Sequence, residues 1–132
     1  MSVPPNAFDA TFPGTPPGVG AMRQAVVDLA ERCGMTADAV GDARLAVSEA
    51  ATNAVIHAYR ERPGQLRLHA SVERGELKLV IADDGDGLLP RTDSPGLGLG
   101  LPIMSAVSER CEVVSGPDGT EIHLAFRCPA AA

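Results

Sequence analysis

Aromatic residues are scarce in this chain, which has no tryptophan and only 3% Phe, Tyr and Trp together. Its core must therefore be built from Ala, Val, Leu and Ile. Lysine occurs once, and the 3 cysteines are widely spaced without a C-x-x-C pair: Lys78, Cys33, Cys111 and Cys128. An odd number of scattered cysteines argues against a disulfide framework or a zinc site and favours reduced thiols.

The chain also lacks a long apolar run and a charged-then-apolar leader, so we expect a cytoplasmic protein. Acidic residues outnumber basic residues, and the formal net charge is −6. This charge argues against binding to nucleic acid or to an anionic membrane, but it allows one bound nucleotide. The 132 residues suit a single domain over 1–132, with loose ends at 1–6 and 129–132.

Periodicity and turn residues predict helices first and then strands with one inserted helix. Thr15 and Thr36 are expected to cap the first two helices. The predicted helices cover 19–33, 37 to before Pro63, and 101–109; the predicted strands cover 7–12, 66–72, 77–82, 111–115 and 120–127. We therefore expect a two-layer α/β sandwich, in which a mixed, mostly antiparallel sheet carries helices on one face.

The second predicted helix contains the segment LAVSEAATNAVIHAY. On a helical wheel, Glu49, Asn53 and His57 form a polar strip between an alanine-rich face and a second apolar side at Leu45 and Ile56. Such a strip is either solvated surface or a ligand site, because buried polar groups need partners. The amide of Asn53 suits a hard cation, and Glu49 one turn earlier could act as a general base beside it. We interpret His57 as structural.

The segment DDGDG follows the predicted central strand and allows more than one interpretation. Asp-Gly pairs are common in plain turns. A calcium loop is excluded, because Leu88 and Pro95 stand where ligands would be needed. A nucleobase pocket is the third interpretation: Asp83 would accept a hydrogen bond from an exocyclic amine, and Gly85 and Gly87 would let the backbone approach a flat ring.

The segment GLGLGLP over 96–102 is the third motif. It is not a Rossmann fingerprint, because Leu101 stands where the third glycine should be, and no Gly-Lys-Ser/Thr of a P-loop occurs. A flexible loop without a binding role is one interpretation of this segment. The glycines also run into a predicted helix with Pro102 in its first turn, and the free N–H groups of such a helix start suit a phosphate.

In chain order these motifs read E-x-x-x-N on a helix, D-x-G-x-G after a strand, G-x-G-x-G-L before a helix, and Gly119-Thr120 opening a strand. This arrangement, which spans 45–120, resembles the GHKL (Bergerat-fold) ATPases, the gyrase, Hsp90, histidine-kinase and MutL type of ATP-binding domain. Within that superfamily, LAVSEAATNAVIHAY is similar to the bacterial anti-sigma-factor serine kinases, the type that includes the SpoIIAB and RsbW proteins.

The resemblance implies a role for each motif residue. Glu49 is expected to activate the attacking hydroxyl, and Asn53 to bind the Mg²⁺ that bridges the phosphates of ATP. Asp83 is expected to accept from the adenine amino group, with Thr120 nearby. The other expected nucleotide contacts are two adenine-pocket glycines and the phosphate-facing start of the following helix: Gly85, Gly87, Gly98, Gly100 and Leu101.

The resemblance also implies a function, an ATP-dependent protein serine kinase that phosphorylates a STAS-type anti-anti-sigma partner and sequesters a sigma factor. A homodimer is one candidate assembly. A non-catalytic nucleotide-binding regulatory module is an alternative, because the segment 88–95 is short for an ATP lid. A detached histidine-kinase-type catalytic domain is another, although His69 and His123 fall in predicted strands rather than on a helical hairpin.

Overall fold

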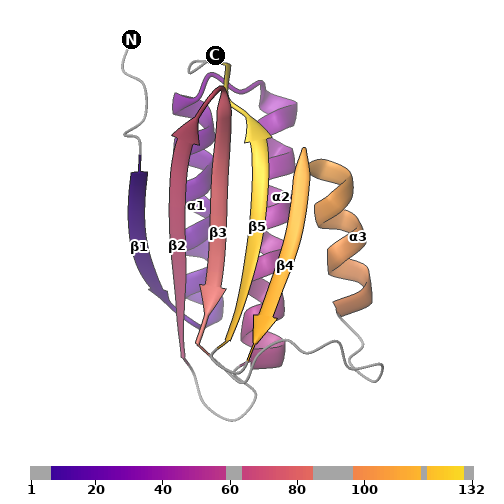
Figure 1. Ribbon diagram of the computed structural model, residues 1–132. Coiled ribbons are helices and arrows are strands. Elements are labelled where there is room, and N and C mark those ends of the chain that lie inside the picture. The colour runs from indigo at the N-terminus through magenta and orange to yellow at the C-terminus, as the bar shows by residue number, and fades with distance from the viewer. Residues whose placement is uncertain (1–6, 59–63, 85–96, 117–118, 130–132) are drawn as a thin grey trace.

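The computed structural model describes residues 7–58, 64–84, 97–116 and 119–129 of the chain. Its elements are β1 (Ala7–Pro13), α1 (Pro16–Arg32), α2 (Ala37–Asn53), the π-helix η1 (Ala54–Ala58), β2 (Gln65–Glu73), β3 (Glu76–Asp83), α3 (Leu97–Val107), β4 (Arg110–Gly116) and β5 (Gly119–Arg127). The five strands form one sheet in the order β1-β2-β3-β5-β4, and each neighbouring pair is antiparallel (Figure 1).

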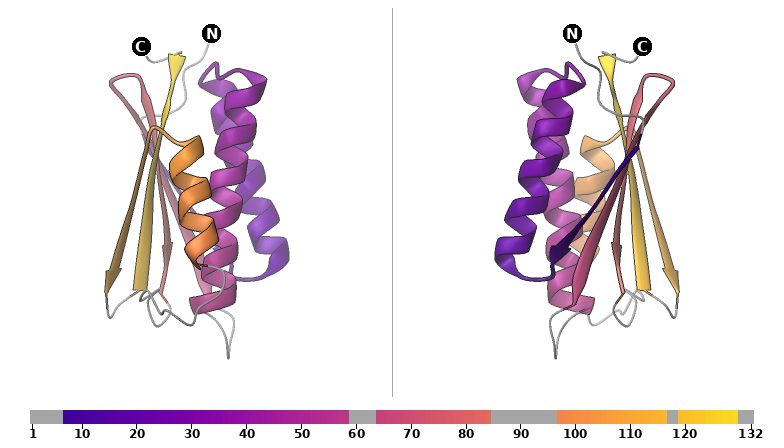
Figure 2. Two further views of the ribbon diagram at one scale, coloured as in Figure 1. Left: turned by 90° about the vertical axis from the view of Figure 1, so that its right-hand side faces the viewer. Right: turned by 90° about the vertical axis from the view of Figure 1, so that its left-hand side faces the viewer.

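The helices α1, α2 and α3 lie together on one face of this sheet, so the predicted two-layer α/β sandwich is confirmed (Figure 2). The sheet was predicted to be mixed, but no parallel pair occurs among the described strands. α2 lies between α1 and α3 and packs against both. Its side toward the core consists of Val47 and of alanines that are fully buried: Ala43, Ala46, Ala50 and Ala51. No helix within the described ranges is long and apolar enough to cross a membrane.

Local sequence signals explain where the first elements begin. The hydroxyl of Thr15 accepts from the backbone N–H of Gly18 at 3.3 Å, and that of Thr36 accepts from Ala39 at 3.2 Å. Both predicted N-caps are therefore confirmed. The turn between β2 and β3 places Arg74 at φ 50° and Gly75 at φ 77°, the positive values of a tight hairpin turn.

The strands follow their predicted periodicity. In β2, buried and more exposed residues alternate, and its buried side chains face the helices: Leu66, Leu68, Ala70 and Val72. β3 lies between β2 and β5, as its apolar run predicts. The core between the layers is aliphatic rather than aromatic, in agreement with the composition.

Two boundaries differ from the prediction. α3 begins at Leu97 and ends at Val107, so Pro102 lies inside the helix and not in its first turn. The long second helix is α-helical only to Asn53 and continues as the wider turn of η1. The α-helical spacing that would align His57 with Asn53 therefore stops at Asn53.

Candidate functional site

The motif residues in the described ranges gather toward one end of the molecule. α2 and β3 run toward this end, and β5 and α3 start from it, at the bottom of Figure 1. The antiparallel pairing of β3 with β5 places the last residue of β3 beside the start of β5. Because α2 packs against β3, β5 and α3, residues from distant parts of the sequence meet there.

Asn53 is the last residue of α2 and is only 4% exposed. Among the side chains that the structure describes, its Nδ2 is the one buried nitrogen or oxygen without a hydrogen-bond partner. A buried amide of this kind is costly unless a ligand completes it. The nitrogen and oxygen ends of an amide are nearly isosteric, so a half-turn of the side chain would present the oxygen at the same place. Asn53 therefore fits the predicted role of a ligand for Mg²⁺.

Glu49 lies one turn before Asn53 on α2 and is half-buried. The preceding residue, Ser48, connects two helices: its hydroxyl accepts from Arg23 Nε of α1 at 2.8 Å and donates to the Arg44 carbonyl at 2.7 Å. α1 is thus hydrogen-bonded to α2 beside Glu49. No local pattern predicts this contact, because its partners come from different helices.

Asp83 and Thr120 face each other as partners in the β3–β5 ladder. Both are buried, with exposures of 4% and 1%. Ser115 of β4 adds a second hydroxyl beside that of Thr120, since its Oγ lies 3.0 Å from Thr120 Oγ1. The structure therefore brings together the two residues predicted to flank the adenine amino group, and Ser115 is a neighbour that the sequence did not predict.

Gly119 explains how β5 approaches the end of β3 so closely. A Cβ at this position would lie 2.0 Å from the carbonyl oxygen of Asp83, and the residue has φ +128°. Only glycine accepts both conditions without strain. The glycine before Thr120 was the sequence signal for this close approach, but the pattern alone did not indicate the contact with Asp83.

The glycine motif was predicted to precede a helix, and its position in the structure differs. Gly98 and Gly100 lie within the first turn of the helix and not before it. Leu101 follows them and packs, half-buried, against the core. The first N–H groups of a helix have no partner within it, and in α3 these groups belong to the turn that contains the glycines. The phosphate-facing role of this turn stays a prediction.

Several predicted positions fall outside the described residues. These are Gly85 and Gly87 of the expected adenine pocket and the segment 88–95. For His57 the structure describes the backbone and not the side chain. The roles assigned to these residues therefore stay predictions.

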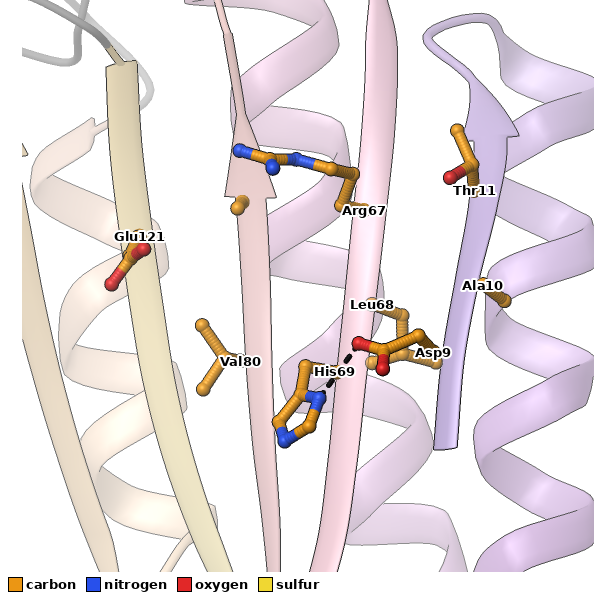
Figure 3. A pocket seen from close by; sticks show the side chains of 9 residues that line it. Asp9, Ala10, Thr11, Arg67, Leu68, His69, Val80 and Glu121 are labelled. Atoms are coloured by element: carbon orange, nitrogen blue, oxygen red, sulfur yellow. Dashed lines mark hydrogen bonds and ion pairs between the residues drawn. The ribbon is translucent and has the colours of Figure 1, made fainter. Parts of the chain in front are cut away.

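The opposite face of the sheet carries a separate hollow of about 350 Å³ (Figure 3). It is lined by polar side chains of β1, β2 and β5, including a hydrogen-bonded pair in which His69 Nδ1 lies 2.7 Å from Asp9 Oδ1. None of the predicted site residues lines this hollow. The described residues also contain no group of three His, Cys, Asp or Glu that could hold a metal ion.

Residues 12–126 match the family described as the histidine kinase-like ATPase domain. The chain belongs to this family. As a histidine kinase-like ATPase domain, it carries the fold and the motif order that the resemblance predicted.

Curated relatives of this ATPase domain include bacterial regulators. The serine-protein kinase RsbW of Bacillus velezensis is 34% identical over 131 residues, which cover 87% of this chain and 82% of the relative. RsbW of Bacillus subtilis is 35% identical, covering 80% and 76%. The anti-sigma F factor of Halalkalibacterium halodurans is 36% identical, covering 67% and 70%. These names agree with the predicted type of ATPase, the anti-sigma-factor serine kinases.

Solved structures share the fold of this ATPase domain. The histidine kinase domain of the Erythrobacter litoralis EL346 blue-light activated histidine kinase has a TM-score of 0.63 at 26% identity and covers 85% of this chain and 60% of its own. The RsbU and RsbW domains of a Mycobacterium tuberculosis protein have a TM-score of 0.74 at 21% identity, covering 94% and 33%. At that identity the second likeness shows the fold alone.

Proposed function

We propose that this protein is an ATP-dependent protein serine kinase that also acts as an anti-sigma factor. The observation that carries the proposal is the buried amide of Asn53, whose nitrogen has no partner within the described structure and which lies one turn after a half-buried glutamate. Relatives that match most of the chain are named serine-protein kinase RsbW and anti-sigma F factor.

Each described site residue has a defined task in this proposal. Asp83, beside Thr120, accepts a hydrogen bond from the adenine amino group and so selects ATP. Asn53 holds Mg²⁺, which would neutralise the phosphate charge and polarise the transferred group. Glu49 takes the proton from the serine hydroxyl as that oxygen attacks the γ-phosphate, and ADP leaves.

The first turn of α3 supports the phosphates in the same proposal. We expect the free backbone N–H groups of this turn, that of Gly98 among them, to donate to the phosphates, with Gly100 and Leu101 following in the same helix. Such donors matter here because the site is acidic and the single lysine of the chain, Lys78, belongs to no phosphate-binding motif. A cation and helix N–H groups therefore replace the usual basic side chains.

The partners proposed are a STAS-type anti-anti-sigma protein, which supplies the serine, and a sigma factor, which is held when that serine is already phosphorylated. We further propose that the chain acts in the cytoplasm as one domain, and that it works as a homodimer. Co-elution of the chain with each candidate partner, in the presence of ATP and of ADP, tests the partner exchange.

The kinase proposal is tested by incubating the protein with labelled ATP, Mg²⁺ and each STAS-domain protein of the same genome. We expect label on one of them, and we expect Glu49→Gln to slow transfer by about 10²- to 10⁴-fold while ATP binding is kept. Asp42→Ala, an exposed change on the same helix, is the matched control and should transfer at the wild-type rate. ATP binding without transfer to any candidate would instead favour the non-catalytic regulatory module.

A further inference from the structure

Two large apolar side chains are exposed along the outer side of α2 and η1. Leu45 is 42% exposed and Ile56 is 54% exposed, although most aliphatic residues of the described structure are buried. Glu49 and Thr52, both half-buried, lie between them in the chain, and Leu45, Glu49 and Thr52 share one side of α2. We call the four residues Leu45, Glu49, Thr52 and Ile56 the outer strip.

The outer strip contains the glutamate that the proposed kinase uses as its base. At about 1.5 Å rise per residue, Leu45 lies about 6 Å before Glu49 along α2. Ile56 lies no more than about 10 Å after Glu49, because the wider η1 rises less per residue than α2. A protein partner usually covers about 800 Å² of surface, which corresponds to a patch roughly 30 Å across. A partner whose serine reaches the Glu49 carboxylate therefore covers both apolar side chains.

We propose that Leu45 and Ile56 are docking contacts for the protein substrate, one on each side of the accepting serine. This inference rests on the proposed kinase function and adds to it the surface that selects the substrate. The occupant is the STAS-type partner, and it must carry apolar side chains beside its serine to match this strip. Continuity with Glu49 argues for this partner, because the serine that it supplies must reach that carboxylate.

The hollow on the opposite face of the sheet cannot serve the same purpose. It is lined by residues of β1, β2, β3 and β5 and contains no residue of α2. A substrate bound there would lie across the sheet from Glu49. Docking and chemistry are therefore expected on the helical side of the molecule.

The test compares Leu45→Gln and Ile56→Gln with the wild type in transfer of labelled phosphate to the STAS-domain protein that the wild type phosphorylates. Glutamine keeps helix propensity while removing the apolar contact. We expect each variant to raise KM for the protein substrate roughly 3- to 10-fold, with kcat and ATP affinity unchanged. The separate variant Leu45→Met keeps an apolar side chain at this position, so its KM for the protein substrate should equal that of the wild type.

Val114→Thr is the matched control, because Val114 is 48% exposed but lies on β4, away from α2. It should leave KM at the wild-type value. Wild-type transfer with unchanged KM in both glutamine variants would overturn the docking inference and leave the kinase proposal intact. Absence of transfer by the wild type to every STAS-domain protein would overturn both. Thermal melting and ATP binding of each variant exclude misfolding as the cause of a raised KM.

Discussion

Replacing Asn53 by alanine should change two quantities in opposite directions: the stability of the nucleotide-free protein and the stability gained from Mg-ATP. Asn53 is 4% exposed, and its Nδ2 has no acceptor within the described structure. Most buried polar residues stabilise a protein, so their removal costs free energy. Here the opposite is expected for the nucleotide-free protein, because the amide is only partly satisfied without a ligand. The same change should abolish the gain in stability that Mg-ATP provides.

Three contributions decide the size of the effect on the free energy of unfolding. Removing an unpaired buried donor recovers about 1–3 kcal/mol. Alanine is a better helix former than asparagine by about 0.5 kcal/mol. The smaller side chain leaves a small cavity, which costs about 1 kcal/mol. The net expectation is a stabilisation of roughly 1 kcal/mol, which for a domain of this size raises Tm by about 3–6 °C.

Thermal melts with and without Mg-ATP provide the assay. At a nucleotide concentration of about 100 times Kd, the wild type should gain about 2.7 kcal/mol, whereas Asn53→Ala should gain almost nothing. Asp42→Ala, an exposed change on the same helix, should keep both the wild-type Tm and the wild-type gain. A variant that melts clearly below the wild type without nucleotide, or that gains as much from Mg-ATP, would refute the assignment of Asn53.

Two further predictions concern the backbone and a buried thiol. Gly119→Ala should lower the free energy of unfolding in urea by about 2–4 kcal/mol and weaken ATP binding, because its Cβ would lie 2.0 Å from the Asp83 carbonyl oxygen at φ +128°; a loss below about 1 kcal/mol would contradict this close approach. Burial, together with a hydrogen bond to the Cys128 thiol, raises the pKa of Cys33 from 9.0 to about 12. The unfolded chain therefore ionises this thiol first, so its contribution to stability is complete below pH 9 and declines between pH 9 and 12. Urea unfolding of Cys33→Ala should show a flatter decline over that range than the wild type, and equal slopes would argue against the shift.

Much of the fold follows from short-range patterns. Threonines before apolar helices predicted both N-caps, and alternating apolar residues over 66–72 predicted the strand β2, which the structure confirms. The boundaries that sequence reasoning missed lie where packing outweighs local preference. α3 begins at Leu97 although Gly98, Gly100 and Pro102 all weaken a helix, and its packing against α2 compensates for that cost.

In the candidate site, too, some positions follow from the sequence and others depend on tertiary packing. Glu49 and Asn53 lie on one helix, so the sequence placed them one turn apart without tertiary information. The pairing of Asp83 with Thr120 needed the strand order, in which β5 inserts between β3 and β4. The contact between Arg23 and Ser48 needed the packing of α1 on α2.

The sequence by itself determined the elements, the two-layer class and the identity of the motif residues, because periodicity, caps and turns act over a few neighbouring residues. Only the tertiary structure decided that Asn53 is buried with an unpaired nitrogen and that Gly119 lies against the Asp83 carbonyl. It also decided that Leu45 and Ile56 stay exposed beside Glu49. Burial and close approach depend on which distant segments pack together, and no local pattern contains that information.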